Sequence, residues 1–398
     1  MLFVDVTLAT IVSGLAIPVI VFFVETLAAT FLPTGRDVAG AAHSRRGRVA
    51  VLIPAHNESS GIRETIDDIR VQLSPDDTLL VIADNCTDDT SSIARAAGAE
   101  VIERNDISKV GKGYAIDWGL SHLRACPPDV VIVIDADCRL SINAIDKLAK
   151  TCIATGQPTQ SLYLMTAPEG ARVDYRVAQF AFRVKNWIRP LGLRALGLPC
   201  QLMGTGMAFP WSAISPIDIA SSETVEDLKL GLDLAMSGHP PTFCPIAVVT
   251  SEFPTLQNAA LNQRERWEHG HIRMILSAAP RVILRGLINR KLTLLMMGLD
   301  LAVPPLTVLM FLTAGTAAAS ACMFLAGFSS IALVISALNL ATLIAAVFLC
   351  WFTRGRDILP PHSIFALFAF ALNKLVLYRK MMTHRGPTEW IRTNREKE

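Results

Sequence analysis

The sequence predicts an α/β domain flanked by transmembrane and interfacial helices. Short β-branched runs alternate with helical stretches between about residues 48 and 209, and strands that alternate with helices pair in parallel through crossovers. Charged residues gather between Arg36 and Arg290, whereas long apolar runs occupy both ends. The mean hydropathy is +0.40 and only 18% of residues are charged, which is low for a soluble enzyme. A net charge of +2 gives no general attraction to nucleic acid.

The first apolar run extends from Val6 to Val24 without a charge and is long enough to span a bilayer. A cleaved signal peptide is the alternative, but no basic residue precedes the run and no clear small-residue cleavage site follows it. Four arginines come after it instead, which places the following residues in the cytoplasm by the positive-inside rule: Arg36, Arg45, Arg46 and Arg48. We therefore expect a transmembrane anchor over residues 1–35. Eight cysteines without paired zinc-type spacing agree with a reducing compartment.

The α/β domain is expected over residues 48–271. Its predicted strands are Val49–Ile53, Thr78–Ala83, Glu100–Arg104 and Val130–Asp135. The predicted helices between them are Gly61–Leu73, Ser91–Ala97 and Lys112–Arg124, whose apolar residues recur at helical spacing. In parallel sheets ligands bind beyond the carboxyl ends of the strands, so functional residues are expected there.

After this domain, residues 272–292 mix arginines with leucines and isoleucines, which predicts an amphipathic helix lying in the membrane interface. Two transmembrane helices are expected within residues 293–352, at Leu294–Ala318 and Ile331–Phe352. Asp300 lies in the first of them, and it is either a functional carboxylate or a residue near the cytoplasmic interface.

The C-terminal residues 353–398 are expected to hold an interfacial helix and a basic cytoplasmic tail. The apolar run Ile364–Leu377 is short for a span, and basic residues follow it. If that run crossed the membrane, the basic tail would be exported, against the positive-inside rule.

Polar residues follow the first two predicted strands. Pro54 is expected to stop the first strand, and Asn57 and Glu58 then offer polar groups suited to a nucleoside. The second strand is followed by Asp84 and a run of polar residues that can accept hydrogen bonds from a base or ribose. Taken alone, the first segment favours a polar turn and helix cap, and the second is equally consistent with a capped turn rich in Asp and Asn.

Asp135 and Asp137 come directly after the strongly apolar run Val130–Ile134. Two carboxylates at the end of a buried strand are costly unless a cation compensates them. Magnesium or manganese takes a few carboxylate oxygens together with phosphate oxygens. An isolated Asp-x-Asp also occurs by chance, and its place after a buried strand strengthens the metal interpretation.

Two further motifs lie nearer the C-terminus. Glu226 and Asp227 open a helical stretch, whose N-terminus favours an ionised carboxylate able to act as a general base. In Gln263-Arg264-Glu265-Arg266-Trp267, Arg266 can neutralise a departing diphosphate and Trp267 can stack on a sugar. The alternative is an interfacial helix whose arginine and tryptophan anchor it to lipid.

These motifs stand in the order found in the family 2 glycosyltransferases, which the chain resembles between about Val49 and His271. The closer resemblance is to the membrane-integrated branch with cellulose, hyaluronan, chitin and poly-N-acetylglucosamine synthases. It implies a GT-A-like (Rossmann-like) nucleotide-sugar domain and Mg²⁺ or Mn²⁺ as cofactor.

The resemblance also implies residue roles. The donor-side residues would be Pro54, Asn57, Glu58, Asp84, Lys112 and Asp135. Among them, Asp84 and Glu58 would bind the nucleoside, which is usually uridine, and Lys112 would lie near the nucleotide. The metal would contact Asp135 and Asp137. Asp227, beside Glu226, would deprotonate the acceptor hydroxyl. Acceptor-side or leaving-group residues are Gly204, Thr205, Gln263, Arg266 and Trp267. Met203 replaces a cysteine common in relatives, which leaves the acceptor open.

The expected activity is inverting transfer of a sugar, usually UDP-linked, to a growing saccharide or lipid-linked acceptor in polysaccharide biosynthesis. One base suits inversion, whereas retention needs a second carboxylate at the anomeric carbon, which the resemblance disfavours. The expected location is a bacterial inner or plasma membrane with the catalytic domain in the cytoplasm. Membrane lipid and export proteins are further expected partners, and nucleic acid is not.

Other functions remain as alternatives. A non-processive enzyme would add one sugar to a polyprenyl-linked intermediate. A membrane transporter is disfavoured because no repeated set of helices is visible. An inactive scaffold is disfavoured because all the acidic motifs are present.

Overall fold

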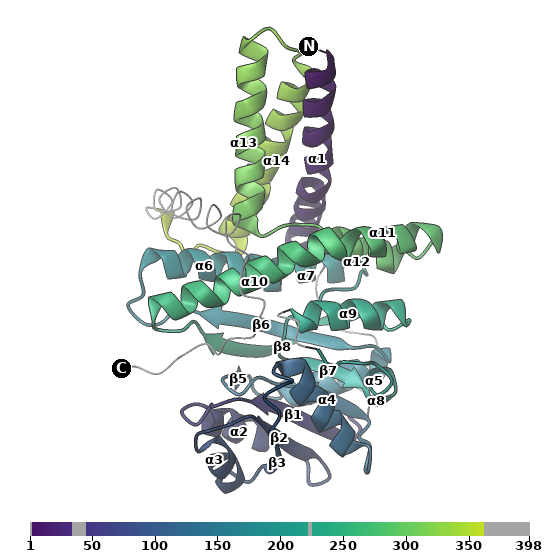
Figure 1. Cartoon of the computed structure of the whole chain (residues 1–398), viewed down its shortest axis with the longest axis vertical. Helices are drawn as coiled ribbons and strands as arrows, with labels where there is room; N and C mark the ends of the chain where they lie inside the picture. Colours follow the sequence, from purple (N-terminus) through teal and green to yellow (C-terminus); the bar gives the residue numbers. More distant parts are fainter. Residues whose placement is uncertain (1, 34–44, 222–224, 362–398) are drawn as a thin grey trace. The chain divides into compact units, whose positions relative to one another are not determined.

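The computed structural model describes residues 2–33, 45–221 and 225–361 (Figure 1). The chain divides into two compact units. The sheet unit takes the described residues of Gly35–Ala171 and Leu198–Gly270, and the helical unit takes those of Met1–Thr34, Arg172–Gly197 and His271–Arg385. The expected helix Ile364–Leu377 and the basic tail lie outside the described residues.

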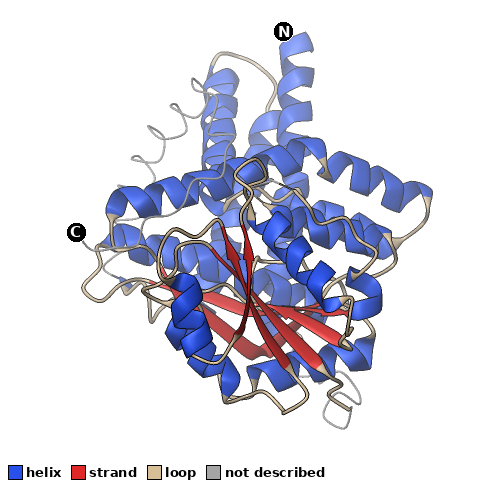
Figure 2. Ribbon diagram, turned by 60° about the horizontal axis from the view of Figure 1, so that its bottom comes forward, coloured by secondary structure: helices blue, strands red, loops and turns tan. Residues whose placement is uncertain are grey.

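The sheet unit contains one eight-stranded sheet with the strand order β3-β2-β1-β4-β7-β6-β8-β5 (Figure 2). Its strands are β1 (Val49–Ala55), β2 (Thr78–Asp84), β3 (Glu100–Arg104), β4 (Val130–Val133), β5 (Arg139–Leu140), β6 (Thr159–Thr166), β7 (Met207–Pro210) and β8 (Thr242–Glu252). The first four strands pair in parallel, which confirms the predicted α/β arrangement. β7 is antiparallel to both β4 and β6, so the sheet is mixed.

The described helices of this unit surround the sheet (Figure 2). They are α2 (Ile62–Arg70), α3 (Thr90–Ala96), α4 (Lys112–Leu123), α5 (Ala144–Thr155), α8 (Trp211–Ile214) and α9 (Glu226–Met236), followed by α10 (Gln257–Ser277), which continues beyond the unit. The three helices predicted between the first four strands are α2, α3 and α4, so these predictions are confirmed to within a few residues at each end.

The prediction that Pro54 stops the first strand is wrong. β1 continues to Ala55, and Pro54 pairs with Ile82 of β2. On its other side the pairing with β4 ends at Leu52 and Val133, two residues earlier. Proline has no N–H to donate to a neighbouring strand. Because Pro54 lies beyond the end of the β1–β4 pairing, no carbonyl group of that pairing lacks a donor.

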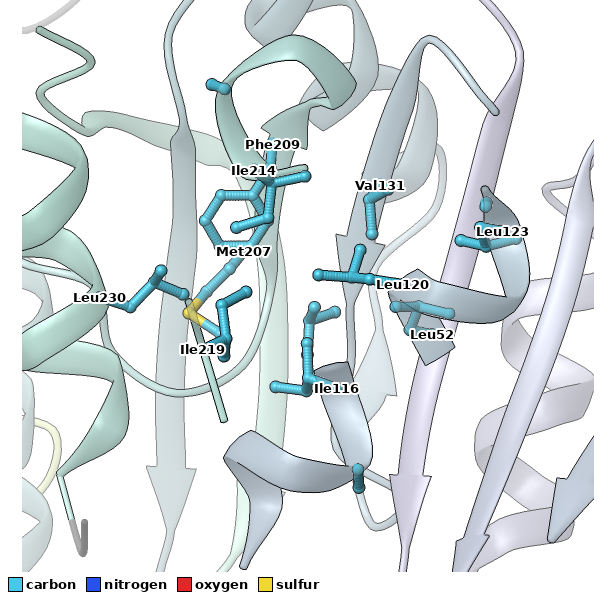
Figure 3. Close-up of a cluster of buried hydrophobic side chains, with 14 of the residues drawn as sticks. Leu52, Ile116, Leu120, Leu123, Val131, Met207, Phe209, Ile214, Ile219 and Leu230 are labelled. Atoms are coloured by element: carbon cyan, nitrogen blue, oxygen red, sulfur yellow. The ribbon is translucent and has the colours of Figure 1, made fainter. Parts of the chain in front are cut away.

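A buried apolar cluster joins α4 to one face of the sheet. Side chains of α4, including Ile116 and Leu120, pack against Leu52 of β1 and Val131 of β4 (Figure 3). Phe209 of β7 belongs to the same buried cluster. Each such side chain contributes on the order of 2 kcal/mol when fully buried. The polar residues that follow β1, β2 and β4 are therefore held at defined positions.

The helical unit contains α1 (Leu2–Phe31), α6 (Val173–Arg183), the π-helical turn η2 (Val184–Ile188), α7 (Arg189–Ala195), α11 (Ala279–Ile288), α12 (Leu292–Leu301), α13 (Leu306–Leu325) and α14 (Ile331–Arg354). Among the described helices, α1, α13 and α14 are long and apolar enough to cross a membrane. These three helices lie side by side (Figure 1).

Two expected helices are divided by proline. The expected span Leu294–Ala318 consists of α12 and α13, because Pro304 and Pro305 interrupt the helical hydrogen bonds between them. The expected amphipathic helix over residues 272–292 consists of the end of α10 and all of α11, with Pro280 in the first turn of α11. Proline fits that first turn because the N–H it lacks has no partner within the helix.

A buried ion cluster joins three helices of the helical unit. Arg189 of α7 donates through Nε to Glu25 Oε2 of α1 at 2.7 Å and through Nη2 to the Asp300 carbonyl oxygen of α12 at 2.8 Å. Nη2 also contacts the Asp300 carboxylate. All three side chains are buried. At Gly192, one turn beyond Arg189, α7 meets α1 so closely that a Cβ atom would lie 1.9 Å from the Glu25 carbonyl oxygen. Asp300 therefore serves helix packing.

Candidate active site

The first part of the site forms where β4 ends and α4 begins. Lys112, the first residue of α4, forms an ion pair with Asp135, which follows β4. The same ammonium group donates to the Gly204 carbonyl oxygen at 2.6 Å. Burial lowers the pKa of Lys112, but the carboxylates of Asp135, Glu226 and Asp227 outweigh burial and raise it above its usual value. Lys112 is therefore a fixed positive charge among acidic groups.

The segment from Met203 to Gly206 is held beside this ion pair by a buried glutamine. Gln160 of β6 donates to the Thr205 carbonyl oxygen at 2.9 Å and accepts from the Met203 N–H at 2.8 Å. Thr205 Oγ1 in turn accepts the Asp135 N–H at 2.9 Å. Gly206 has φ +64°, and a Cβ atom there would meet Ser161 Oγ at 1.8 Å, so only glycine fits. The segment thus positions the Asp135 backbone.

A second threonine holds the turn that contains both aspartates. The Thr65 hydroxyl of α2 lies 2.8 Å from the Ala136 carbonyl oxygen and 2.9 Å from that of Cys138. Asp137 is partly exposed between these two carbonyls. Thr65 and Gln160 were not identified from the sequence, because their partners lie more than 40 residues away and no local motif marks them.

The acidic pair Glu226–Asp227 occupies the first turn of α9, as predicted. A Cβ atom at Gly204 would lie 3.6 Å from Asp227 Oδ2 and 4.0 Å from Lys112 Nζ, which places Gly204 between the two charged groups. Burial and the neighbouring Asp227 carboxylate raise the pKa of Glu226, against the opposing effect of Lys112. The Asp-x-Asp turn and the predicted base are therefore brought together around Lys112 and Gly204.

Arg266 on α10 belongs to the same charged group. Burial lowers the pKa of its guanidinium, and the Glu226 carboxylate opposes that effect. Gln263 and Trp267 lie on one face of α10, because they are four residues apart. Arg266 is three residues after Gln263 and is its neighbour on the helix surface. Gln263 is buried, and its Oε1 has no hydrogen-bond partner in the part of the chain that the structure describes.

The segments that follow β1 and β2 also meet. Asn57 Oδ1 accepts the Thr87 N–H at 2.7 Å, and the Glu58 N–H donates to Thr90 Oγ1 at 2.8 Å. Asn57 has φ 56°, a left-handed conformation that asparagine tolerates better than most residues. The structure therefore unites the two motifs expected at the nucleoside, and Glu58 remains partly exposed beside them.

Asp84, the last residue of β2, is buried against an arginine. Arg104 at the end of β3 donates to Asp84 Oδ1 at 2.5 Å, and its guanidinium lies 5.4 Å from the centre of the Tyr114 ring. Burial raises the pKa of Asp84, and Arg104 opposes that rise. Arg104 was not identified from the sequence. The sequence offered one indication that Arg104 is functional: it lies at the end of a predicted strand, where functional side chains gather.

The residues present fit a cation that is held largely by its substrate. No group of three or more His, Cys, Asp or Glu side chains in the described ranges could hold a metal ion. Asp135 and Asp137 offer two partly exposed carboxylates. Magnesium and manganese commonly take one or two protein carboxylates and complete their shell with phosphate oxygens and water. This donor set suits such an ion and not a structural zinc ion.

Comparison with known proteins identifies the family. Residues 46–270 match the family described as "Glycosyltransferase like family 2", so the chain belongs to that family. The match covers the whole sheet, the Asp-x-Asp turn, Glu226–Asp227 and the Gln263–Trp267 segment.

Individual relatives support the assignment. The chain is 26% identical over 260 residues to "Probable glycosyltransferase YdaM" of Bacillus subtilis (strain 168), covering 58% of this chain and 56% of that one. It is 36% identical over 101 residues to glucosyl-3-phosphoglycerate synthase of Mycobacterium tuberculosis, covering 24% and 30%. The chain thus spans little more than half of the first relative's length.

A solved structure shares the fold. The mannosyltransferase PcManGT from Pyrobaculum calidifontis, solved in complex with GDP-Man and Mn²⁺, superposes with a TM-score of 0.51 at 17% identity. The superposition covers 94% of this chain and 99% of that one. The GT-A-like fold with flanking apolar helices, expected from the sequence, is therefore confirmed.

Proposed function

We propose that this protein transfers a sugar, with inversion, from a nucleotide-sugar to a saccharide or lipid-linked acceptor at a membrane surface. The observation that carries the proposal is the grouping of Lys112, Asp135 and Asp227 around Gly204. A cationic group for phosphate, a carboxylate for a metal and a carboxylate for proton removal then lie within one small region. Family membership supports the same reaction class.

On the donor side, Asp84 and Glu58 would bind the nucleoside, next to Pro54 and Asn57. Lys112 would face the phosphates with a charge that its acidic neighbours stabilise. A divalent cation, Mg²⁺ or Mn²⁺, would be held by Asp135 and Asp137 and would neutralise the diphosphate. PcManGT was solved in complex with a nucleotide-sugar, GDP-Man, and Mn²⁺, which is consistent with this donor set.

On the acceptor side, Asp227 would accept the proton of the attacking hydroxyl. The acceptor oxygen bonds to the anomeric carbon while the bond to the diphosphate oxygen breaks. Negative charge grows on the leaving diphosphate, and Arg266 would offset it. The raised pKa of Glu226 favours its neutral form beside Asp227, so that two full negative charges need not share the first turn of α9.

The proposal is tested with purified full-length protein, a panel of UDP- and GDP-sugars, and Mg²⁺ or Mn²⁺. We expect nucleotide release with at least one donor, and Asp227→Asn should lower transfer by about 10²–10⁴-fold while donor binding survives. Asp233→Asn is the matched control, because Asp233 lies on the same helix and pairs with Lys229. Transfer by Asp227→Asn at the rate of the unmodified protein would remove Asp227 as the base. Absence of release across the panel would contradict the reaction class.

Polymer synthesis and single addition are separated by the product. The proposed role in polysaccharide biosynthesis, with export proteins as partners, requires products of many sugars. Single addition is the second candidate, and it is supported by the name of glucosyl-3-phosphoglycerate synthase, which indicates a small product. Size analysis of radiolabelled product distinguishes a ladder of long chains from one extended acceptor.

We also propose that the sheet unit faces the cytoplasm of a bacterium and that α1, α13 and α14 cross its inner or plasma membrane. The length and apolar composition of these helices support the proposal. Protease treatment of sealed vesicles of either orientation tests it, because the sheet unit should be cut only where the cytoplasmic face is outside.

A further inference from the structure

A group of arginines and aromatic rings surrounds the last turn of α14. Arg354 is the final residue of that helix, and its guanidinium lies 4.4 Å from the centre of the Trp187 ring in η2. The Arg183 guanidinium at the end of α6 lies 5.6 Å from the same ring. Arg356, two residues after α14, lies 5.4 Å from the ring of Phe352. We call Arg183, Trp187, Arg354 and Arg356 the arginine cluster.

The charges within the arginine cluster are not balanced. Arg183 contacts both carboxylate oxygens of Asp357, at 2.7 and 2.8 Å. No carboxylate in the described part of the chain pairs with Arg354 or Arg356. Three guanidinium groups thus meet one carboxylate, which leaves two positive charges. Aromatic rings contact both guanidinium groups, and no other described residue accepts a hydrogen bond from the side chain of Arg354 or Arg356, so these N–H donors can bind an anion.

The position of the arginine cluster indicates the kind of anion. α14 is one of the helices able to cross a membrane, and a helix that spans the apolar core ends where lipid phosphates lie. Phe348 and Phe352, on one face of its last turns, are both more than half exposed, and their rings are 6.1 Å apart. An apolar face that leads to guanidinium groups without a carboxylate partner among the described residues matches the acyl chains and phosphate of a lipid.

The local structure indicates that these groups are held in place. Trp351 Nε1 donates to the Leu359 carbonyl oxygen at 2.7 Å, which closes the turn after α14. Arg183 donates to the Arg354 carbonyl oxygen at 2.9 Å, which ties α6 to the end of α14. Trp187 lies in a π-helical turn, a rare element that often occurs at functional sites.

We propose that Arg354 and Arg356 bind the phosphate of an anionic membrane lipid and that Trp187 orients Arg354 for a two-pronged contact. Guanidinium groups bind phosphate through paired N–H donors, whereas lysine offers a single point charge. The site is separate from the residues assigned to sugar transfer, so it does not depend on the proposed reaction.

The test uses delipidated full-length protein in neutral detergent. Binding of phosphatidylglycerol and phosphatidylcholine is measured by native mass spectrometry. We expect a preference for phosphatidylglycerol on the order of tenfold, because each arginine near a lipid phosphate adds a several-fold increase. The double variant Arg354→Gln/Arg356→Gln should lose that preference. Arg63→Gln, an exposed arginine of the sheet unit, is the control and should retain it.

Further variants test whether the lipid preference depends on the geometry of the arginine cluster or only on its positive charge. Arg354→Lys and Trp187→Leu should each reduce the preference several-fold, although both preserve the net charge. Full retention in both would overturn the proposed site, as would equal lipid binding by the double variant and the unmodified protein. Arg356→Gln alone changes an exposed side chain that takes part in no described hydrogen bond, so this variant should fold. Its several-fold loss of the phosphatidylglycerol preference can be measured even if the double variant misfolds.

The source of the phosphate is tested separately. Millimolar inorganic phosphate should not displace bound phosphatidylglycerol, because it lacks the acyl chains. Complete displacement would indicate a site for free phosphate and would contradict the lipid proposal.

Discussion

Lys112 contacts the Asp135 carboxylate and the Gly204 carbonyl oxygen through one ammonium group. This relationship joins the start of α4, the end of β4 and the segment before β7. A single charged atom thereby links the donor-side and acceptor-side residues of the candidate site.

The first prediction concerns Lys112. Lys112→Met leaves the Asp135 and Asp227 carboxylates without their shared cation, so the donor phosphates would meet uncompensated negative charge. We expect kcat/KM to fall on the order of 10²-fold. A loss of this size is typical when one strong electrostatic contact to the developing negative charge is removed. Nucleotide release measures the effect. Lys150→Met, whose lysine pairs with Asp146 on α5, should leave the rate unchanged.

The second prediction concerns Thr205. Thr205→Val removes the acceptor of the Asp135 N–H, which is partly buried, and leaving such a group unpaired costs up to about 1–3 kcal/mol. We expect a loss of stability of that order together with at least a tenfold loss of transfer, because the Asp-x-Asp turn shifts. Thr205→Ser retains the hydroxyl and should restore most of both. Equal behaviour of the valine and serine variants would show that the hydroxyl is unimportant.

The third prediction concerns Arg104 and pH. Burial already raises the pKa of Asp84, and Arg104 limits that rise. Arg104→Met should raise the pKa further, so Asp84 becomes protonated at a higher pH. If ionised Asp84 binds the nucleobase, the pH at which nucleotide affinity is lost on acidification should move upwards. Isothermal titration with UDP between pH 5 and pH 8 measures this shift, with the exposed Arg95→Met as control. An unchanged pH profile would separate Asp84 from nucleotide binding.

The fourth prediction concerns His271 on α10. Its Nε2–H donates to the Leu301 carbonyl oxygen at 3.2 Å, and burial, aided by the cations Lys185 and Arg189, lowers the pKa of His271 to about 3. The unfolded chain binds a proton at His271 below about pH 6.5, whereas the folded chain does not. Stability should therefore be full above that pH and fall on acidification towards pH 3, by at most about 1.4 kcal/mol per pH unit.

His271→Asn should make this acid-induced loss of stability less steep. Thermal unfolding at several pH values measures it. His122→Asn is the control, because His122 is exposed and pairs with Glu100. A variant as acid-sensitive as the unmodified protein would show that His271 does not cause the effect.

The fifth prediction concerns the buried ion cluster. Arg189→Met leaves Glu25 and Asp300 buried without their cation, which should cost about 3–5 kcal/mol of stability. The triple variant Glu25→Gln/Arg189→Met/Asp300→Asn removes all three charges and should recover much of that loss. Chemical unfolding in detergent micelles compares the two. A triple variant less stable than Arg189→Met would contradict this explanation.

The sequence predicts the parallel half of the sheet well, because its strands are apolar β-branched runs bounded by turns. It also predicts that Asp84, Asp135 and Asp137 follow strand ends. β7 was not predicted, because four residues carry too little pattern, and its antiparallel pairing depends on the tertiary fold.

Residues that support the site were harder to predict than those within it. Gln160, Thr65 and Arg104 act through partners that only the folded sheet brings near. The interruption before α13 was visible as Pro304-Pro305, but the apolar sequence on both sides favoured one continuous span. Hydropathy detects apolar length, whereas helix continuity depends on backbone N–H groups that proline lacks.

The Glu25–Arg189 contact has a consequence for biosynthesis. The two residues are 164 positions apart, and ribosomes add about 5–20 residues per second, so Arg189 is made roughly 8–30 s after Glu25. If α1 enters the bilayer during translation, it does so before its counter-ion exists. A nascent chain stalled before that point would hold an acidic side chain in the membrane without its cation, which is an energetically costly state.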